Sequence, residues 1–483
     1  MSVERAPRGR RRLRGALASL LVALALAKGA QAFDPLWTEP GVLDDGVILP
    51  GDTLPISSTL KKSPAKTLSL AQAVDMALAS NPQVKASWAQ IKVQAGQVGE
   101  ARAAYWPTLS GAFSGVDDRT TYLGSGLDPF VVDSYQANAS VSWRVLNFGE
   151  EWFNAQAAGQ LLEAALASHN ATLQKTLSEV IQAYFEAFTD REVFFADCRN
   201  AENARQTLVS TRKREAKGVS TRSDTLQATT ALDKALLESN RDQGAYQKGL
   251  AVLSYAIGLS PGAAVTLPET LDDKADSADE DLKDWMADTE RAHPAILAAR
   301  AQVEAARDKV AAAVSDSLPT VDLTGSYYHN GRPGQALTQV GTDETLVSGT
   351  LTVPLFNGFS SVYKVRGAEA QAEAAEAQLQ DTEHQTLMDL VKAYADTVSA
   401  RQNLQASLEL LEAASKALEV SQRRYNKGAA NILEMLSTQS ALANAQEERI
   451  RCLADWRSAR LRLLASAGQL GRTAIDKKPK GRP

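Results

Sequence analysis

The sequence predicts a mainly α-helical fold with four β-strands, arranged as a duplicated unit, and three observations support this prediction. Residues 150–217 form one stretch without proline in which apolar residues recur every three or four positions. Residues 135–145 instead alternate between apolar and polar side chains. Both patterns recur about 210 residues later. We therefore expect two copies of one order: short helix, strand, loop, strand, long helix, short helix.

The stretch 150–217 predicts a single long helix. Its 68 residues would extend about 100 Å at roughly 1.5 Å per residue. The apolar side chains at helical spacing are Leu173, Leu177, Val180, Tyr184 and Ala187. Charged residues interrupt the stretch throughout, so it is too polar to lie across a bilayer and is expected to form a coiled-coil rod in water.

The first 32 residues have the features of a secretory signal peptide. Arginines precede an apolar run at 17–27, and small residues favour cleavage between Ala32 and Phe33. An uncleaved N-terminal anchor is the alternative. Removal of the signal leaves 45 basic and 56 acidic residues, a negative balance that argues against nucleic acid as a partner.

Two helices are expected before the first strand. Residues 33–66 are rich in proline, glycine and acidic side chains and are interpreted as an extended N-terminal lead-in. Ser69 is a candidate N-cap for a helix that Asn81 and Pro82 interrupt. A second helix is predicted from Pro82 to Trp106, since proline is tolerated in a first turn.

The first pair of strands is predicted at 109–116 and 135–145, joined by a loop over 117–134. Strict alternation over 135–145 has the length and pattern of an outer-membrane strand with one face in lipid. A half-buried strand in a soluble sheet is the alternative. Aromatic residues lie near the strand ends, where a membrane-interface girdle would be placed: Tyr105, Trp106 and Phe148.

The second half of the chain repeats the first. Pro82 and Pro107 align with Pro294 and Pro319 at an offset of 212 residues. The turn at Lys217 and Gly218 aligns with Lys427 and Gly428, and Gly258 aligns with Gly468, at an offset of 210. The expected segments are a signal peptide 1–32, a lead-in 33–66, a first repeat 67–258, an equatorial linker 259–281, a second repeat 282–468 with strands at 321–328 and 346–353, and a basic disordered tail 469–483. In each repeat, two shorter helices stacked end to end would match one long helix.

Four strands from one chain cannot close a sheet in lipid, where an open edge is not viable. No segment after the signal has the roughly 18 unbroken apolar residues of a transmembrane helix. If these are membrane strands, several copies of the chain must share one barrel. A dimer and a trimer would both satisfy this geometry.

An ordered set of motifs over residues 69–468 resembles the outer-membrane efflux protein family, the TolC-like outer membrane factors. The set comprises Asn81-Pro82, Tyr105 to Leu109, Leu146 to Gly149, the two Lys-Gly turns and the duplication itself. The resemblance implies a homotrimer whose twelve strands form one transmembrane β-barrel and whose helices form a long periplasmic tunnel. It also implies two partners, a periplasmic adaptor (membrane fusion) protein and an inner-membrane transporter.

The same resemblance implies a periplasmic gate near the two turns. Ser223 and Asp224 match the family's Thr-Asp pair, and Tyr425 matches the tyrosine that hydrogen-bonds this aspartate across neighbouring helices. A family arginine is replaced by Ala430. Three nearby arginines are candidates to substitute for it: Arg222, Arg423 and Arg424.

Two further positions are implied as a selectivity ring. The family has two aspartates three residues apart, where this chain has Glu434 and Ser437, so we expect a weaker but still anionic constriction. The turns themselves are expected to face the adaptor: Lys217, Gly218, Lys427 and Gly428. For all these gate residues, a solvated polar position near a helix end is the alternative.

No pattern in the sequence predicts catalysis. The histidines lack metal-ligand spacing, and no nucleophile or phosphate-binding motif is present, so we expect no enzyme activity, cofactor or metal site. The four histidines are His169, His293, His329 and His384. Cys198 and Cys452 are interpreted as buried free thiols, with a disulfide between them as the alternative.

Three functions therefore compete. A passive outer-membrane exit duct for type I protein secretion, with an ABC transporter, is favoured because residues 33–66 and Asn81 to Trp88 resemble family members that serve cyclolysin secretion, which suggests an RTX or cyclolysin-like cargo. A duct for small-molecule or drug efflux with a proton-driven pump would use the same tunnel. A periplasmic coiled-coil protein without a pore is the third reading, and the paired strands argue against it.

Overall fold

The computed structural model describes residues 67–121, 123–124, 130–268, 281–330 and 341–471. The predicted signal peptide, the whole lead-in and nearly all of the basic tail lie outside these residues. The described chain separates into two compact units, and both repeats contribute to each. One unit contains residues 95–151 and 319–353, and the other contains 67–94, 152–318 and 354–471.

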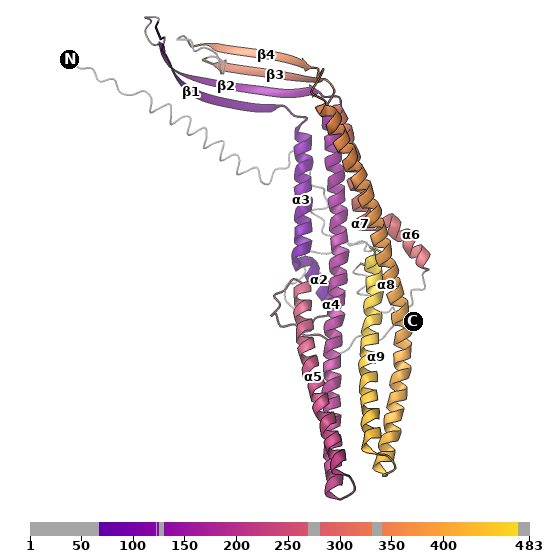
Figure 1. The fold of residues 1–483 in the computed structure, drawn as a ribbon. Coiled ribbons are helices and arrows are strands. Elements are labelled where there is room, and N and C mark those ends of the chain that lie inside the picture. The colour runs from indigo at the N-terminus through magenta and orange to yellow at the C-terminus, as the bar shows by residue number, and fades with distance from the viewer. Residues whose placement is uncertain (1–66, 122, 125–129, 269–280, 331–340, 472–483) are drawn as a thin grey trace, which may run out of the picture. The chain divides into compact units, whose positions relative to one another are not determined.

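The first repeat contains four helices, labelled in Figure 1: α2 (Leu70–Ser80), α3 (Pro82–Ala103), α4 (Glu150–Ala216) and α5 (Arg222–Ala256). Ser69 caps α2 as predicted, because its side chain accepts from the Gln72 backbone N–H while Gln72 bonds back to the Ser69 backbone. Helix α3 is shorter than predicted and stops at Ala103. The next residues form tight turns before Pro107, since a proline disfavours helical geometry in the residue that precedes it.

The four helices of the second repeat have the same lengths as their counterparts in the first. The second repeat contains α6 (Leu282–Ala292), α7 (Pro294–Ser315), α8 (Ser360–Asn426) and α9 (Ile432–Ser466). The long helices α4 and α8 each have 67 residues, and the return helices α5 and α9 each have 35. This agreement in length supports the duplication seen in the sequence.

The shorter helices meet end to end beside each long helix, as predicted. Where α5 ends, the Asn81 amide donates to the carbonyl of Ala256 (3.0 Å), and the Asn81 side-chain oxygen accepts from the N–H of Gln83 (2.8 Å). In the second repeat, the same slot holds His293, whose Nδ1 accepts from the N–H of Ala295 (3.2 Å). Both residues therefore cap the helix that follows them. Figure 1 shows α3 and α5 in line beside α4.

The main core lies where the two repeats meet near these junctions. The predicted face of α4 is buried there, including Leu173, Leu177 and Tyr184, each at most 1% exposed. The Tyr184 hydroxyl donates to the carbonyl of Leu68 (3.2 Å). Part of the predicted linker also packs into this core, because Leu267 is buried and its carbonyl accepts from Arg191 (2.8 Å).

The four strands form one antiparallel sheet in the order β1-β2-β3-β4. Their bounds are β1 (Thr108–Thr120), β2 (Phe130–Leu146), β3 (Thr320–His329) and β4 (Asp343–Thr352). The predicted loop over 117–134 is wrong at both ends, because Asp117 to Thr120 pair with Phe130 to Asp133 and extend the hairpin. Backbone pairing satisfies the N–H and C=O groups of these residues, although their sequence shows no clear alternation of apolar and polar residues.

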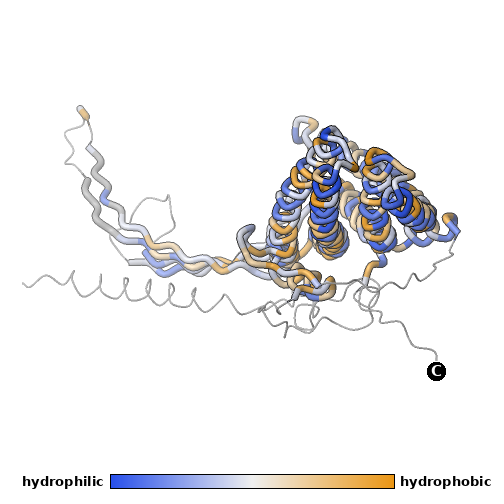
Figure 2. The backbone as a smooth tube through the Cα atoms, turned by 90° about the horizontal axis from the view of Figure 1, so that it is seen from below, coloured by the Kyte–Doolittle hydropathy of each residue, from blue (hydrophilic) through white to orange (hydrophobic). Residues whose placement is uncertain are grey.

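The register places apolar and polar side chains on opposite faces of the sheet. One face carries exposed apolar residues, including Leu109, Phe113 and Trp143. The other carries hydroxyl and amide side chains, and Ser110 and Ser140 hydrogen-bond across it (2.8 Å). Figure 2 shows the mixed hydropathy along these strands and along the helices.

The two repeats are joined in the sheet by the β2–β3 pair. Arg144 Nε of β2 donates to Asp322 Oδ1 of β3 at 3.1 Å.

Over the described residues, no helix combines the length and apolarity needed to cross a membrane.

Candidate functional site at the helix-turn tips

The predicted tips are the turns that join α4 to α5 and α8 to α9. Gly218 has φ +73° and Gly428 has φ +75°, the left-handed geometry that ends a helix and favours glycine. In each turn, the glycine N–H bonds to a carbonyl three residues before it, that of Glu215 or Tyr425. The same hydrogen bond forms in both turns, which confirms that each Lys-Gly motif marks the C-terminal end of a long helix.

Asp224 belongs to the N-terminal cap of α5. Its carboxylate accepts from the Thr221 backbone N–H (2.8 Å) and from the Ser220 hydroxyl (2.7 Å), and its own N–H donates to the Thr221 hydroxyl (3.2 Å). These hydrogen bonds lower the pKa of Asp224 below its usual value, and the bond from the Thr221 backbone N–H has the largest effect. Ser223 beside it is exposed.

Tyr425 is buried at the other tip, with only 6% of its surface exposed. It packs with Ile432 and Met435 of α9, and Ala430 lies against the same cluster. The Tyr425 hydroxyl has no hydrogen-bond partner among the side chains and backbone that the structure describes. Within one chain, the predicted bond between Tyr425 and Asp224 is therefore not formed, and a bond across copies stays a prediction.

Arg214 is a tip residue that the sequence analysis missed. Its guanidinium lies 4.5 Å from the centre of the Tyr425 ring, and its Nη1 donates to the Tyr425 carbonyl (3.2 Å). It also contributes a small electrostatic lowering of the pKa of Asp224. Arg214 occupies the same repeat position as Arg424, at an offset of 210 residues, so alignment of the two turns could have singled it out.

The two helical hairpins are α4–α5 and α8–α9. Each of the three arginines predicted as substitutes pairs with a carboxylate of its own helical hairpin. Arg222 lies 3.7 Å from Glu215, and Arg423 lies 3.2 Å from Glu419. Arg424 Nη1 lies 2.8 Å from Glu434 Oε1. All three arginines are at least half exposed, so each pair is worth about 1 kcal/mol or less.

The two residues of the predicted selectivity ring lie on the first turns of α9. The Glu434 N–H donates to the Asn431 side chain (2.8 Å), which caps α9. Ser437 is exposed. Within one chain, Arg424 offsets the charge of Glu434. The sequence analysis did not assign this partner to Glu434.

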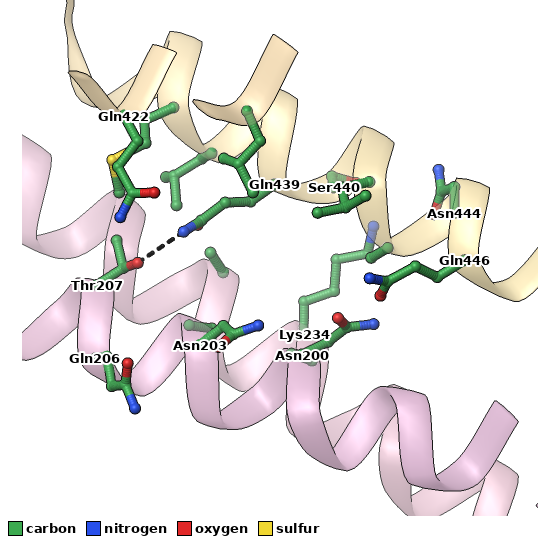
Figure 3. Close-up of a pocket in the computed structure, with 18 of the residues that line it drawn as sticks. Asn200, Asn203, Gln206, Thr207, Lys234, Gln422, Gln439, Ser440, Asn444 and Gln446 are labelled. Carbon is green, nitrogen blue, oxygen red and sulfur yellow. Dashed lines mark hydrogen bonds between the residues drawn. The ribbon is translucent and has the colours of Figure 1, made fainter. Parts of the chain in front are cut away.

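A polar cavity of about 360 Å³ lies between the two hairpins above the tips. Figure 3 shows amide and hydroxyl side chains from both hairpins facing it, and Gln439 donates to Thr207 across it (2.9 Å). Asp197 also lines the cavity, and its pKa is raised to about 7, mainly by burial and then by a hydrogen bond with Asp242.

The remaining candidate residues have local structural roles. Cys198 and Cys452 are free thiols, as predicted, but only Cys452 is buried, whereas Cys198 is exposed. His169 Nδ1 lies 2.7 Å from the Ser87 hydroxyl, and His329 Nδ1 lies 2.6 Å from Asp343. Across the residues that the structure covers, no group of histidine, cysteine and carboxylate side chains has the arrangement of a metal site.

This architecture of paired long helices, two turn tips and a two-faced four-stranded sheet is that of a TolC-like outer-membrane channel protein. The sequence profile described as outer membrane efflux protein matches residues 73–259 and 285–469, so the chain belongs to this family. Its place is therefore the outer membrane of a Gram-negative cell.

Two curated relatives and one solved structure illustrate the similarity. The chain is 32% identical to Protein CyaE of Bordetella pertussis over 95% of each chain, and 26% identical to outer membrane protein OprJ of Pseudomonas aeruginosa over 88% of this chain and 89% of the relative. The crystal structure of the outer membrane protein VceC from Vibrio cholerae superimposes with a TM-score of 0.72 over 83% of this chain and 96% of that chain, at 22% identity. The last comparison shows the fold alone.

Proposed function

We propose that the protein is a passive, trimeric exit duct in the outer membrane and that it performs no chemistry. The observation that carries the proposal is the sheet. Its face with exposed apolar side chains suits lipid, its hydroxyl-rich face suits water, and its edge strands β1 and β4 each pair on one side only within a chain. Because open strand edges are not tolerated in lipid, copies of the chain must pair these edges.

Three copies would supply twelve strands for one barrel, and their helices would form the periplasmic tunnel. Energy must then come from partners, a periplasmic adaptor at the turn tips and an inner-membrane transporter. The tips are suited to this contact because Lys217 and Lys427 are exposed beside the two turn glycines.

For cargo, type I protein secretion with an ABC transporter is the function that we favour. Support comes from the similarity to CyaE over 95% of both chains and from the resemblance of the N-terminal region to members that serve cyclolysin secretion. The cargo would then be an RTX or cyclolysin-like protein. Small-molecule or drug efflux with a proton-driven pump is the second candidate, because the family is that of outer membrane efflux proteins.

Planar-bilayer conductance of the detergent-extracted protein, together with migration of unboiled samples on a gel, tests the duct. We expect discrete, cation-preferring openings from an SDS-resistant trimer. A soluble protein without conductance would contradict the duct and favour a coiled-coil protein without a pore.

Deletion of the gene in its host separates the two cargoes. Loss of a large secreted protein from the medium, with unchanged drug susceptibility, is expected for type I secretion. Increased susceptibility with unchanged secretion would instead favour small-molecule efflux. Complementation with the intact gene is the control.

A further inference from the structure

The two hairpins of one chain, α4–α5 and α8–α9, face each other near the tips across a surface that is largely polar. The cavity of about 360 Å³ separates them over several turns and is lined by side chains such as Asn200, Asn203 and Asn444. A polar, hollow interface gains little from apolar burial, so specific contacts must hold the hairpins together.

Arg214 makes such a contact at the end of the cavity nearest the tips. It lies in the last turn of α4, and its guanidinium covers the Tyr425 ring at 4.5 Å while Nη1 bonds to the Tyr425 carbonyl at 3.2 Å. The α9 residues Ile432 and Met435 pack around the same ring. The ring is thus held between its own hairpin and a cation from the other, an arrangement that cation–π attraction favours.

The equivalent residue of the second repeat shows that this contact is specific to Arg214. Arg424 lies 210 residues later, at the matching point of α8, but it pairs with Glu434 of its own hairpin. The position that would face it in the first hairpin is Glu215, which matches Tyr425 in the repeat and cannot offer an aromatic ring. The duplication therefore produced two similar turns, and the link between hairpins at the tips runs from Arg214 to Tyr425.

We propose that Arg214, stacked on Tyr425, holds the two hairpins of each chain together at the tips, in addition to the Gln439–Thr207 hydrogen bond across the cavity, and so keeps the periplasmic end of the duct closed. Arg214 acts through Tyr425 and is a positioning residue. This inference rests on the proposed duct function, since closure has meaning only for a pore. The separation of the hairpins can nevertheless be measured independently of conductance.

Single-channel conductance of three variants tests the role in closure. Arg214→Gln removes the charge and should raise the ratio of open to closed channels by about ten-fold, the factor that corresponds to about 1.4 kcal/mol. Arg214→Lys keeps a cation and should fall between this variant and the wild type. Arg212→Gln is the matched control, because Arg212 is exposed on the same turn, and it should leave opening unchanged. Equal opening in Arg214→Gln and the control would overturn the proposal.

A distance measurement keeps the test valid if the wild type conducts nothing. Spin labels on cysteines at Lys217 and Lys427, in a Cys198→Ser background, report the separation of the two tips in oligomers diluted with unlabelled chains. Arg214→Gln should lengthen or broaden this distance distribution, and Arg212→Gln should not. An unchanged distribution would refute the role of Arg214, whereas absent wild-type conductance would refute the duct alone.

Reversal by a crosslink excludes general misfolding as the cause. Thr207 and Gln439 face each other across the cavity, with their side-chain atoms 2.9 Å apart. Cysteines at these two positions, joined by a short reducible crosslinker in the Arg214→Gln protein, should restore the closed state, and reduction should open it again. Failure of the joined hairpins to close would contradict the proposal.

Discussion

Replacement of Gly258 by alanine tests how tightly the end of α5 packs against the break between α2 and α3. Gly258 has φ +77°, and a Cβ there would lie 2.7 Å from the Ser80 carbonyl carbon and 2.9 Å from the Asn81 nitrogen. Both atoms belong to the backbone and cannot rotate away. We expect about 1–2 kcal/mol of loss from the left-handed backbone and about 1–3 kcal/mol more from overpacking.

Gly218→Ala is the matched control for this prediction. Gly218 has nearly the same φ, +73°, but nothing lies within 4 Å of a Cβ built there. The backbone cost and the gain from a less flexible unfolded chain apply to both variants, so the difference between them isolates the packing cost. In the second repeat, Gly468→Ala should resemble Gly258→Ala, because a Cβ there would lie 2.7 Å from Cδ of Pro294, a ring atom bonded to the backbone nitrogen that cannot rotate away.

Urea unfolding of the full chain in detergent, followed by helical circular dichroism, measures these differences. Gly258→Ala should shift the free energy of unfolding by about 1–3 kcal/mol more than Gly218→Ala does. Equal losses in the two variants would refute the close approach of α5 to the Ser80–Asn81 backbone.

Three further outcomes are expected. Burial lowers the pKa of His293 to about 4, and its Nδ1 must stay unprotonated to accept from Ala295, so the unfolded state alone binds this proton between about pH 6.5 and 4. Stability should fall as pH decreases through this window, by about 3 kcal/mol at most, and His293→Asn should remove this pH dependence in unfolding measurements. Glu434→Gln should reduce cation preference, and an unaltered reversal potential would place Glu434 outside the pore. Tyr425→Phe and Asp224→Ala should each raise conductance if the Tyr425 hydroxyl bonds Asp224 of a neighbouring copy; unchanged conductance in both would remove that latch. Tyr425→Phe is the cleaner variant, because Asp224→Ala also removes the carboxylate that accepts from the Thr221 N–H in the capping box of α5.

The helix ends were predictable because the signals that set them are local. Ser69 caps α2, and Gly218 ends the α4 turn, within a residue or two of the predicted positions. Capping side chains and left-handed glycines act on backbone groups a few residues away, so a short window of sequence contains the information.

The strand lengths were less predictable because pairing depends on a partner strand. Residues 117–120 lack the alternation of 135–145, yet they pair with residues 130–133 and continue the hairpin. Once the inner register is formed, each added pair satisfies backbone groups at little further cost in loop-closure entropy, whatever the side chains.

The sequence by itself determined the duplication, the two 67-residue helices, the four strands and the family to which the chain belongs. Hydrophobic period, caps and repeat spacing encode these features directly. Only the tertiary structure decided how the tips are connected. Arg214 and Arg424 occupy equivalent positions, but one stacks on Tyr425 of the other hairpin and the other pairs with Glu434 of its own. Such a choice depends on which partner the packed helices bring within a few ångströms, and the spacing of residues along one helix does not contain that distance.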